Sequence, residues 1–255
     1  MSLHGKVAIV TGATRGIGAG IVRALAKQGA NVTFSYVSES SAPEAARLVD
    51  EVQALGVCAT AVRVDISSVT APAALVEAAL TNLGTNKIDI LVNNAGLGGN
   101  ASLEELTMEE YERLMAVNVK GVIFITQAVL PYISRGGRIV NLSSISARGG
   151  YSTQTVYAAS KAAVEGLTRV WATELGHKYG VNVNAVNPGP VDTDMYRAAG
   201  PVHLARMEEQ IKKVPAAPRC GTEQDIADIV VFLCEERSRR VTGDTICANG
   251  GVLYT

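Results

Sequence analysis

The sequence predicts a doubly wound α/β fold in which helices cover both faces of a seven-stranded parallel sheet. Two observations predict this fold class. Short runs rich in valine and isoleucine alternate with longer amphipathic stretches along the chain, which is the pattern of repeated βαβ units. The run 88–92 is also almost continuously apolar, as expected for a strand that is covered on both faces.

The expected elements follow in order along the chain. Strands are expected near 6–11, 31–36, 58–64, 88–93, 137–143, 182–187 and 244–248. Helices are expected at about 16–28, 42–55, 70–84, 107–132, 154–179 and 222–235. Two of these helices begin with a threonine followed three residues later by an acid, Thr107 with Glu110 and Thr222 with Asp225, which predicts a capping box at each start.

The alternation of strands and helices breaks at about 188–218. This segment holds five prolines and two glycines around a short amphipathic piece from about 202 to 214. We expect it to be a mobile lid over a substrate site rather than a linker between domains. The chain contains no internal repeat or low-complexity tract, and 255 residues are not too many for one α/β unit. A single domain, 1–255, is therefore predicted.

The composition favours a compact protein with a small-molecule partner. Apolar residues make up 47% of the chain and charged residues 18%, which is enough to build a large core. The 23 basic residues are balanced by 24 acidic ones, so no strong field attracts nucleic acid or an anionic membrane. We expect no nucleic-acid or membrane partner.

The N-terminal sequence, the length of the apolar runs and the cysteines indicate the cellular compartment of the protein. The first apolar stretch, 7–10, leaves no room for a signal peptide, and no apolar run approaches the roughly 20 residues that span a bilayer. A cytoplasmic location is the default expectation. Widely spaced cysteines indicate buried reduced thiols, with a disulfide framework as the alternative; they are Cys58, Cys220, Cys234 and Cys247. The scattered histidines His4, His177 and His203 have no ligand spacing, so no metal is predicted.

A glycine-rich turn follows the first expected strand and opens the first helix, in the segment Thr11-Gly12-Ala13-Thr14-Arg15-Gly16-Ile17-Gly18. Glycine permits a tight turn and a close approach of the backbone to a pyrophosphate, whose charge then meets the positive end of the helix dipole. This context predicts a dinucleotide-binding turn. A purely steric role for the glycines is the alternative.

The GxxxGxG spacing of this turn resembles that of the short-chain dehydrogenase/reductase family, which has a Rossmann-type fold, and later segments agree with it. The segment Asn93-Asn94-Ala95-Gly96 resembles the family's NNAG segment, which supports the sheet and borders the adenosine side. Asp65 matches the position that contacts the adenine ring, and Pro188-Gly189 with Thr193 resembles the PGxxxT segment that flanks the nicotinamide. Each of these is, by itself, also explained by an ordinary turn at a strand end. The glycine turn, Asp65, the NNAG segment and the PGxxxT segment occur in the order that the family has, and the four together favour the family.

The resemblance implies NADP(H) as the cofactor. Enzymes that select NAD commonly place an acid at the end of the second strand, and here that place is Tyr36. Arg15 lies where similar NADPH-using members hold a cation against the 2′-phosphate, and Ser38 offers a hydroxyl donor; Arg15 as a solvated surface residue, and the nearby acid Glu39, argue the other way. The implied cofactor-binding residues are Gly12, Thr14, Arg15, Gly16, Ile17, Gly18, Tyr36, Ser38, Asp65, Ile66, Asn94, Ala95, Gly96, Tyr157, Lys161, Pro188, Gly189, Val191 and Thr193.

A tyrosine and a lysine stand four residues apart on the fifth expected helix. Residues at i and i+4 share one helix face, so Tyr157 and Lys161 point into the same cleft. A phenol titrates near 10, and a neighbouring ammonium, together with the charge of an oxidised nicotinamide, is expected to lower its pKa toward the range useful for acid catalysis. Tyr157 as a core aromatic with a satisfied hydroxyl is the alternative.

The family resemblance supplies two further catalytic residues. Ser144 lies thirteen residues before Tyr157, the family's spacing, and is implied to be the second donor to the substrate carbonyl, while Ser143 faces structure. Asn118 resembles the family asparagine that holds a water beside the lysine and completes a proton relay; asparagine also weakens a helix interior, which favours a functional role. The expected catalytic set is Asn118, Ser144, Tyr157 and Lys161.

These expectations predict an oxidoreductase that reduces a ketone, or oxidises the alcohol, with NADPH. The chain most resembles 3-oxoacyl carrier-protein reductases and fungal-type polyketide ketoreductases. An NAD-dependent alcohol or sugar dehydrogenase and a non-catalytic nucleotide-binding protein remain alternatives. A pocket that is apolar with polar edges is expected from the lid and the segment 147–151. Similar members are commonly tetramers, and the apolar Val164, Leu167, Val170 and Trp171 either form such a contact or pack internally.

Overall fold

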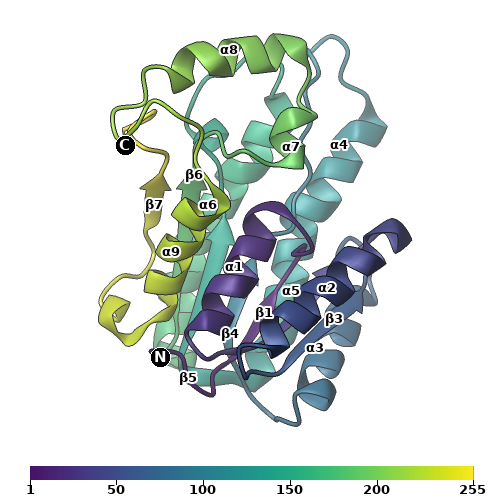
Figure 1. The fold of residues 1–255 in the computed structure, drawn as a ribbon. Coiled ribbons are helices and arrows are strands. Elements are labelled where there is room, and N and C mark those ends of the chain that lie inside the picture. The colour runs from purple at the N-terminus through teal and green to yellow at the C-terminus, as the bar shows by residue number, and fades with distance from the viewer. Residues whose placement is uncertain (255) are drawn as a thin grey trace.

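Seven strands form one parallel sheet at the centre of the protein (Figure 1). The computed structural model describes residues 1–254, apart from the Val202 side chain. The strands are β1 Val7–Val10, β2 Asn31–Tyr36, β3 Ala59–Arg63, β4 Ile88–Asn93, β5 Ile133–Leu142, β6 Asn182–Pro188 and β7 Thr245–Ala248. Their order across the sheet is β3-β2-β1-β4-β5-β6-β7, and every neighbouring pair is parallel. The predicted fold class is confirmed.

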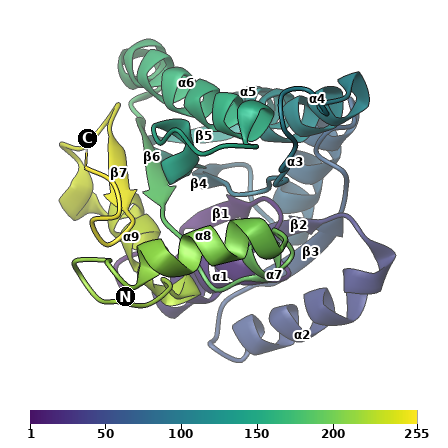
Figure 2. The same cartoon turned by 90° about the horizontal axis from the view of Figure 1, so that it is seen from above.

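Helices form a layer on each side of the sheet (Figure 2). They are α1 Gly16–Lys27, α2 Ala42–Gln53, α3 Ala71–Asn82, α4 Met108–Met115, α5 Val122–Val129, α6 Thr155–Tyr179, α7 Asp194–Arg197, α8 Pro201–Ile211 and α9 Glu223–Cys234. One layer contains α1, α2 and α9, and the other contains α3, α4, α5 and α6. Each layer seals its own apolar core against the sheet, and β4 is buried along its whole length between the two.

The order of the strands reverses between β1 and β4, because the chain winds outward from β1 to β3 and then returns to the other side of β1. In a doubly wound sheet, a crevice opens at this point beyond the carboxyl ends of the strands, and ligands bind there. The glycine-rich turn leaves β1 and the NNAG segment leaves β4, so the fold brings both segments to this crevice.

Three element boundaries differ from the predicted ones. The helix expected over 107–132 is interrupted by a π-helical turn, Ala116–Gly121, between α4 and α5. Strand β5 begins at Ile133 rather than near 137, because Ile133 pairs with Ile88 ahead of an irregularity in register. The predicted lid contains two helices, α7 and α8.

The threonine caps form as predicted at α9 and in part at α4. Thr222 and Asp225 complete a capping box at the start of α9. At α4, Thr107 accepts a hydrogen bond from the Glu110 N–H, but the Glu110 carboxylate turns toward Gly99, where a Cβ would lie 3.0 Å from its Oε1. The start of α4 is therefore capped by the Thr107 hydroxyl alone, without the reciprocal hydrogen bond from the Thr107 N–H to Glu110.

The expectation that no apolar stretch approaches the length of a membrane span is wrong for one helix. The continuous helical segment Met108–Tyr132 is long and apolar enough to cross a membrane by length and composition. Its apolarity has a structural reason, because it forms part of a helix layer, with α3 beside α5 and α6 beside α4.

Two further expectations need correction. Burial of the thiols holds for Cys234 alone, whereas Cys58 and Cys247 are exposed and Cys220 is partly exposed. Of the apolar residues considered for a subunit contact, Val164 is buried and Trp171 packs against the core beneath α6, so these two pack internally. Val170 is 51% exposed and stays available for a contact.

Candidate active site

The glycine turn is fixed by close contacts to the segment after β4. Gly12 has a φ of +64°, and a Cβ on it would lie 2.8 Å from the Ala95 Cα; a Cβ on Gly18 would lie 2.5 Å from Asn94 Nδ2. The Asn94 amide donates to the carbonyls of Thr11, at 2.9 Å, and Gly12, at 2.8 Å. The two predicted motifs therefore form one unit, and glycine is required where they meet.

The start of α1 has the features of an anion site. Its N-cap residue, Arg15, has an extended backbone and makes no side-chain cap, and its first turn contains no acid. The first N–H groups of the helix therefore need partners, and the positive end of the helix dipole meets a hollow lined by Thr14, Gly16 and Thr193. Three acids also line this hollow, and each is paired with an arginine: Asp192 with Arg197, Asp194 with Arg15 and Glu223 with Arg23. Thr14, Gly16 and Thr193 fit the pyrophosphate of a dinucleotide.

The side chain of Arg15 also lines this hollow and forms an ion pair there. Its Nη1 lies 3.6 Å from Asp194 Oδ2, at the start of α7, and the side chain is 71% exposed. The structure thus pairs Arg15 with an acid of the predicted lid. Ile17, two residues on, packs against the core beneath α1.

The end of β2 carries no acid at Tyr36, as the sequence indicates. Ser38 caps the short helical turn Glu39–Ser41 by accepting a hydrogen bond from the Ser40 N–H. The guanidinium of Arg63, at the end of β3, donates from Nε to the Val37 carbonyl and forms an ion pair with Glu39. Sequence analysis missed Arg63, although the parallel pairing of β2 with β3 places it beside Tyr36.

Asp65 and Ile66 follow β3 at the same edge. The Asp65 carboxylate accepts hydrogen bonds from the N–H and the hydroxyl of Ser67, which fixes the turn. Ile66 is buried against Gly121, where a Cβ would lie 2.9 Å from the Ile66 Cδ1. This contact requires a glycine at the end of the π-helical turn.

The PGxxxT segment closes the other side of the crevice. A Cβ on Gly189 would lie 3.1 Å from the Asn249 Cβ, so Pro188-Gly189 passes closely over the segment after β7. Val191 is buried and pairs with Gly221. The Thr193 hydroxyl caps α7, and its methyl group would lie 3.3 Å from a Cβ on Gly16. Thr193 therefore lies against the glycine turn.

Tyr157 and Lys161 lie one helical turn apart near the start of α6. The Lys161 Nζ lies 6.0 Å from the centre of the Tyr157 ring and donates to the Leu142 carbonyl at 2.7 Å. Ser144 follows β5 in extended conformation, and its side chain is close enough to the Tyr157 hydroxyl to oppose the rise in the pKa of that phenol. Three of the four predicted catalytic side chains therefore converge on one place at the carboxyl edge of the sheet.

The titration of this pair differs from the prediction. Burial raises the pKa of Tyr157 above its usual value of 10, and the hydrogen bond from Ser144 opposes this shift. Burial also lowers the pKa of Lys161 to about 8. The Lys161 ammonium contacts the Leu142 carbonyl and is itself destabilised by desolvation, so in this structure it does not make the phenol acidic.

Asn118 lies in the π-helical turn, a type of distortion that is frequent at functional sites. Its side chain is fully buried: Oδ1 accepts from the Leu97 N–H at 2.8 Å, and Nδ2 donates to the Leu97 carbonyl and to the Ser160 hydroxyl, both at 3.0 Å. A Cβ on Gly96 would lie 3.4 Å from Asn118 Oδ1 and 3.3 Å from Lys161 Nζ. The amide thus joins the segment after β4 to α6 beside the lysine.

A buried acid that sequence analysis missed stands behind Ser144. Glu165 is 4% exposed, and it accepts hydrogen bonds from the Ser143 hydroxyl at 2.9 Å, from Arg148 Nε at 2.7 Å and from Asn187 Nδ2 at 3.1 Å. Asn187 Nδ2 also donates to the Ser144 carbonyl at 2.8 Å. Ser143 faces structure, as expected, and this network fixes the backbone that presents Ser144.

The predicted lid touches the loops around Tyr157 at three points. Asn100 donates to the Ala199 carbonyl at 3.1 Å, and the Met195 side chain packs over Gly98. Arg206 of α8 lies 5.6 Å from the centre of the Tyr151 ring and donates to the Ser152 hydroxyl at 2.9 Å. Figure 2 shows α8 crossing above the carboxyl edge of the sheet.

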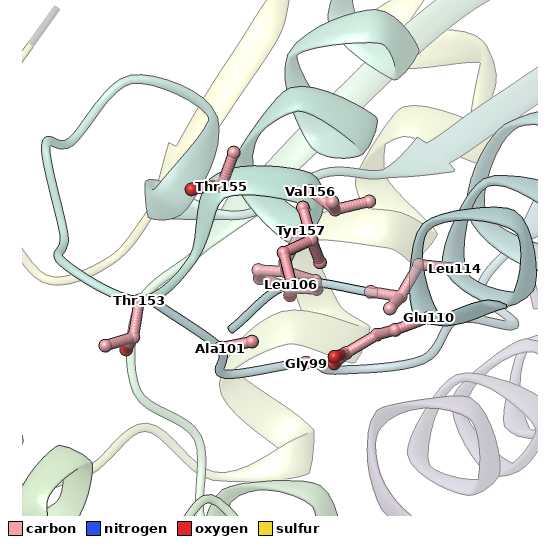
Figure 3. A pocket seen from close by; sticks show the side chains of 9 residues that line it. All are labelled: Gly99, Ala101, Leu106, Glu110, Leu114, Thr153, Thr155, Val156 and Tyr157. Carbon is pink, nitrogen blue, oxygen red and sulfur yellow. The ribbon is translucent and has the colours of Figure 1, made fainter. Parts of the chain in front are cut away.

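A small pocket of about 10 Å³, room for about one water molecule, adjoins Tyr157 (Figure 3). Leu106, Leu114 and Val156 supply apolar walls, and the Glu110 carboxylate points toward Gly99. Apolar surface with a polar edge therefore reaches the candidate tyrosine.

Known proteins resemble this chain over nearly its whole length. A family model described as enoyl-(acyl carrier protein) reductase matches residues 12–253. The short-chain dehydrogenase/reductase FrzI of Cladobotryum sp is 49% identical over 256 residues, which cover 99% of this chain and 97% of that protein. The hydroxynaphthalene reductase-like protein Arp2 of Metarhizium robertsii is 41% identical, covering 98% of this chain and 96% of that protein.

The fold of this chain is also similar to that of a solved structure. The crystal structure of a blue fluorescent protein from a metagenomic library, in complex with NADPH, has a TM-score of 0.92 and 43% sequence identity. The match covers 100% of both chains.

Proposed function

Because the chain belongs to the short-chain dehydrogenase/reductase family, and is thus an oxidoreductase, we propose that it uses NADPH to reduce a ketone to an alcohol, or catalyses the reverse oxidation. One observation carries the proposal. Tyr157 and Ser144 lie close to each other, with Lys161 one helical turn from Tyr157, at the crevice edge that the glycine turn also borders. Two hydroxyl donors beside a cation suit a carbonyl oxygen that gains negative charge.

Ser144 and Tyr157 donate to the substrate carbonyl, and Tyr157 gives up its proton as the alcohol forms. NADPH, when bound, supplies the hydride and, once oxidised, a positive charge. The raised pKa of Tyr157 keeps the phenol protonated at neutral pH, which suits a proton donor. In this structure the Lys161 ammonium contacts the Leu142 carbonyl and does not lower the pKa of the phenol. In the reacting complex it stabilises the phenolate left behind, and Asn118 positions the backbone and the helix around the lysine.

Two observations support NADPH over NADH. The end of β2 has no acid at Tyr36 to bind a free 2′-hydroxyl. A protein of 43% identity was crystallised with NADPH. The uncapped start of α1 and the close packing of the glycine turn suit the shared pyrophosphate.

The substrate we propose is a mainly apolar ketone, such as a polyketide, acyl thioester or aromatic ketone. The mixed walls of the pocket beside Tyr157 support this class, as does the relative that is named hydroxynaphthalene reductase-like. We further propose that 188–218 closes over the substrate through the contacts of Asn100 and Arg206. We also propose a cytoplasmic homo-oligomer, a tetramer, in which exposed apolar side chains such as Phe124 of α5 and Val170 of α6 take part.

Titration of both cofactors against protein fluorescence, followed by a ketone panel, tests the proposal. We expect NADPH to bind at least tenfold more tightly than NADH, and aromatic or polyketide-like ketones to be reduced fastest. Preference for NADH would instead support an NAD-dependent alcohol or sugar dehydrogenase. Binding without turnover of any ketone or alcohol would support a non-catalytic nucleotide-binding protein.

The titration of Lys161 predicts a pH dependence. Its pKa, lowered to about 8, means that the ammonium is present below pH 8 and is lost as the pH rises through that value. The phenol of Tyr157 stays protonated in the same range, because its pKa is raised. We expect kcat/KM for NADPH, which reports the free enzyme, to fall about tenfold per pH unit above 8. A profile that stays flat to pH 9.5 would contradict this assignment.

A further inference from the structure

The loop that follows β2 holds the acid Glu39, and the base Arg63 contacts this loop from the end of β3; the proposed function leaves the roles of both residues open. Parallel pairing aligns Tyr36 with Arg63, so the last residues of β2 and β3 stand side by side at the carboxyl edge. Arg63 therefore reaches the place where an acid in other dinucleotide-binding folds selects NAD.

The guanidinium of Arg63 is held over this loop. Its Nε donates to the Val37 carbonyl at 3.2 Å, and its Nη1 forms an ion pair with the Glu39 carboxylate. The Arg63 side chain is 53% exposed, so donors beyond those two contacts remain open to a ligand. The loop also offers the hydroxyls of Ser38 and Ser40, which are hydrogen-bonded to each other at 2.6 Å.

The ion pair with Arg63 changes how Glu39 affects the binding of a phosphate. An unpaired carboxylate three residues beyond Tyr36 would repel a phosphate, whereas one paired with Arg63 leaves the loop close to neutral. A phosphate that displaces Glu39 from the guanidinium gains a cation and two hydroxyl donors. A free ribose hydroxyl gains no such charge interaction.

The other cations near this edge have different partners. Arg15 faces Asp194 across the pyrophosphate hollow, and Arg47 of α2 pairs with Glu44 at 2.9 Å on its own helix. Arg63 is the guanidinium whose contacts lie in the loop after β2 itself.

We propose that Arg63 binds the 2′-phosphate of NADPH and that Glu39 competes with the phosphate for the Arg63 guanidinium. The inference rests on the proposed use of NADPH. It makes Arg63 a determinant of cofactor specificity and Glu39 a moderator of affinity.

The experiment compares binding, without turnover, of ligands that differ only in this phosphate. Dissociation constants are measured by fluorescence for NADPH and NADH, and by calorimetry for 2′,5′-ADP and 5′-AMP, which lack the nicotinamide. We expect Arg63→Ala to weaken NADPH and 2′,5′-ADP about 10- to 100-fold, the range for loss of a hydrogen bond to a charged group, and to leave NADH and 5′-AMP within twofold. Arg63→Lys keeps the positive charge but not the paired N–H donors of the guanidinium, so it should weaken NADPH binding less than Arg63→Ala does.

Two more variants complete the test. Glu39→Gln should tighten NADPH severalfold and leave NADH unchanged, because the competitor for Arg63 is gone. Arg47→Ala, which removes an exposed, ion-paired guanidinium from α2, is the control and should change the binding of neither NADPH nor NADH.

The outcomes separate this inference from the proposed function. A wild-type protein that prefers NADH defeats the proposed cofactor. A wild-type protein that prefers NADPH, together with an Arg63→Ala variant that keeps the same NADPH-to-NADH ratio, overturns the role of Arg63 alone. Equal weakening of all four ligands also overturns it, since that result indicates a loop that has lost its shape.

Discussion

Replacing Tyr157 with phenylalanine is expected to lower kcat by about 10²- to 10⁴-fold, the usual contribution of a positioned general acid. The substitution removes one hydroxyl from a half-buried side chain and leaves the ring, so the packing at the start of α6 is kept. Ser144 and Lys161 remain, but neither replaces the lost proton donor. We therefore expect the dissociation constant of NADPH to change less than twofold while turnover is lost.

Steady-state kinetics and fluorescence titration of the same preparations measure both quantities. Tyr179→Phe, the same change at the other end of α6, is the matched control and should retain wild-type kcat. Near wild-type turnover by Tyr157→Phe would move the proton donor to another group. Loss of NADPH binding together with activity would show that the hydroxyl holds the cofactor as well.

Replacing Glu165 with alanine is expected to lower the free energy of unfolding by about 3–5 kcal/mol, the usual cost of breaking a buried ion pair. The carboxylate accepts from Ser143, Arg148 and Asn187. Its loss leaves a partly buried guanidinium without this partner and removes one acceptor each from Ser143 and Asn187, which keep the carbonyls of Lys161 and Ser144. For a chain of this size, the loss corresponds to roughly 10 °C in Tm.

Thermal and urea unfolding of purified variants measure the effect. Glu44→Ala removes a carboxylate from the exposed pair with Arg47 and should cost at most about 0.5 kcal/mol. Glu165→Gln keeps one acceptor oxygen and should lie between the two. A loss below about 1 kcal/mol for Glu165→Ala would mean that water replaces the carboxylate.

The fold was predictable because its signals are local. A strand such as β4, buried between two helix layers, must be apolar along its length, and that pattern is visible in the sequence. The early start of β5 was not predictable, because it depends on Ile133 finding Ile88 in a neighbouring strand. The π-helical turn was hidden for the same reason, since the hydrogen-bond partners of Asn118 are Leu97 and Ser160, which lie outside this turn.

The candidate site was predictable where short motifs bring residues together, and less so where distant segments meet. The spacing of Tyr157 and Lys161 along one helix predicts a shared face. The direction of the Tyr157 pKa depends instead on burial, and Lys161 is bound to the Leu142 carbonyl at the end of a strand 19 residues earlier. Glu165 and Arg63 were missed because their importance comes from partners across strands and loops.

The apolar helical segment Met108–Tyr132 has a consequence during synthesis. It leaves the ribosome before α6, which is more than twenty residues further along the chain and lies beside it in the folded protein. For that interval the face of this apolar segment that packs on α6 stays uncovered, whereas α3, which is made earlier, can already pack against α5. A partly synthesised chain with this apolar surface exposed is prone to aggregate, and we expect a holdase chaperone to bind it there.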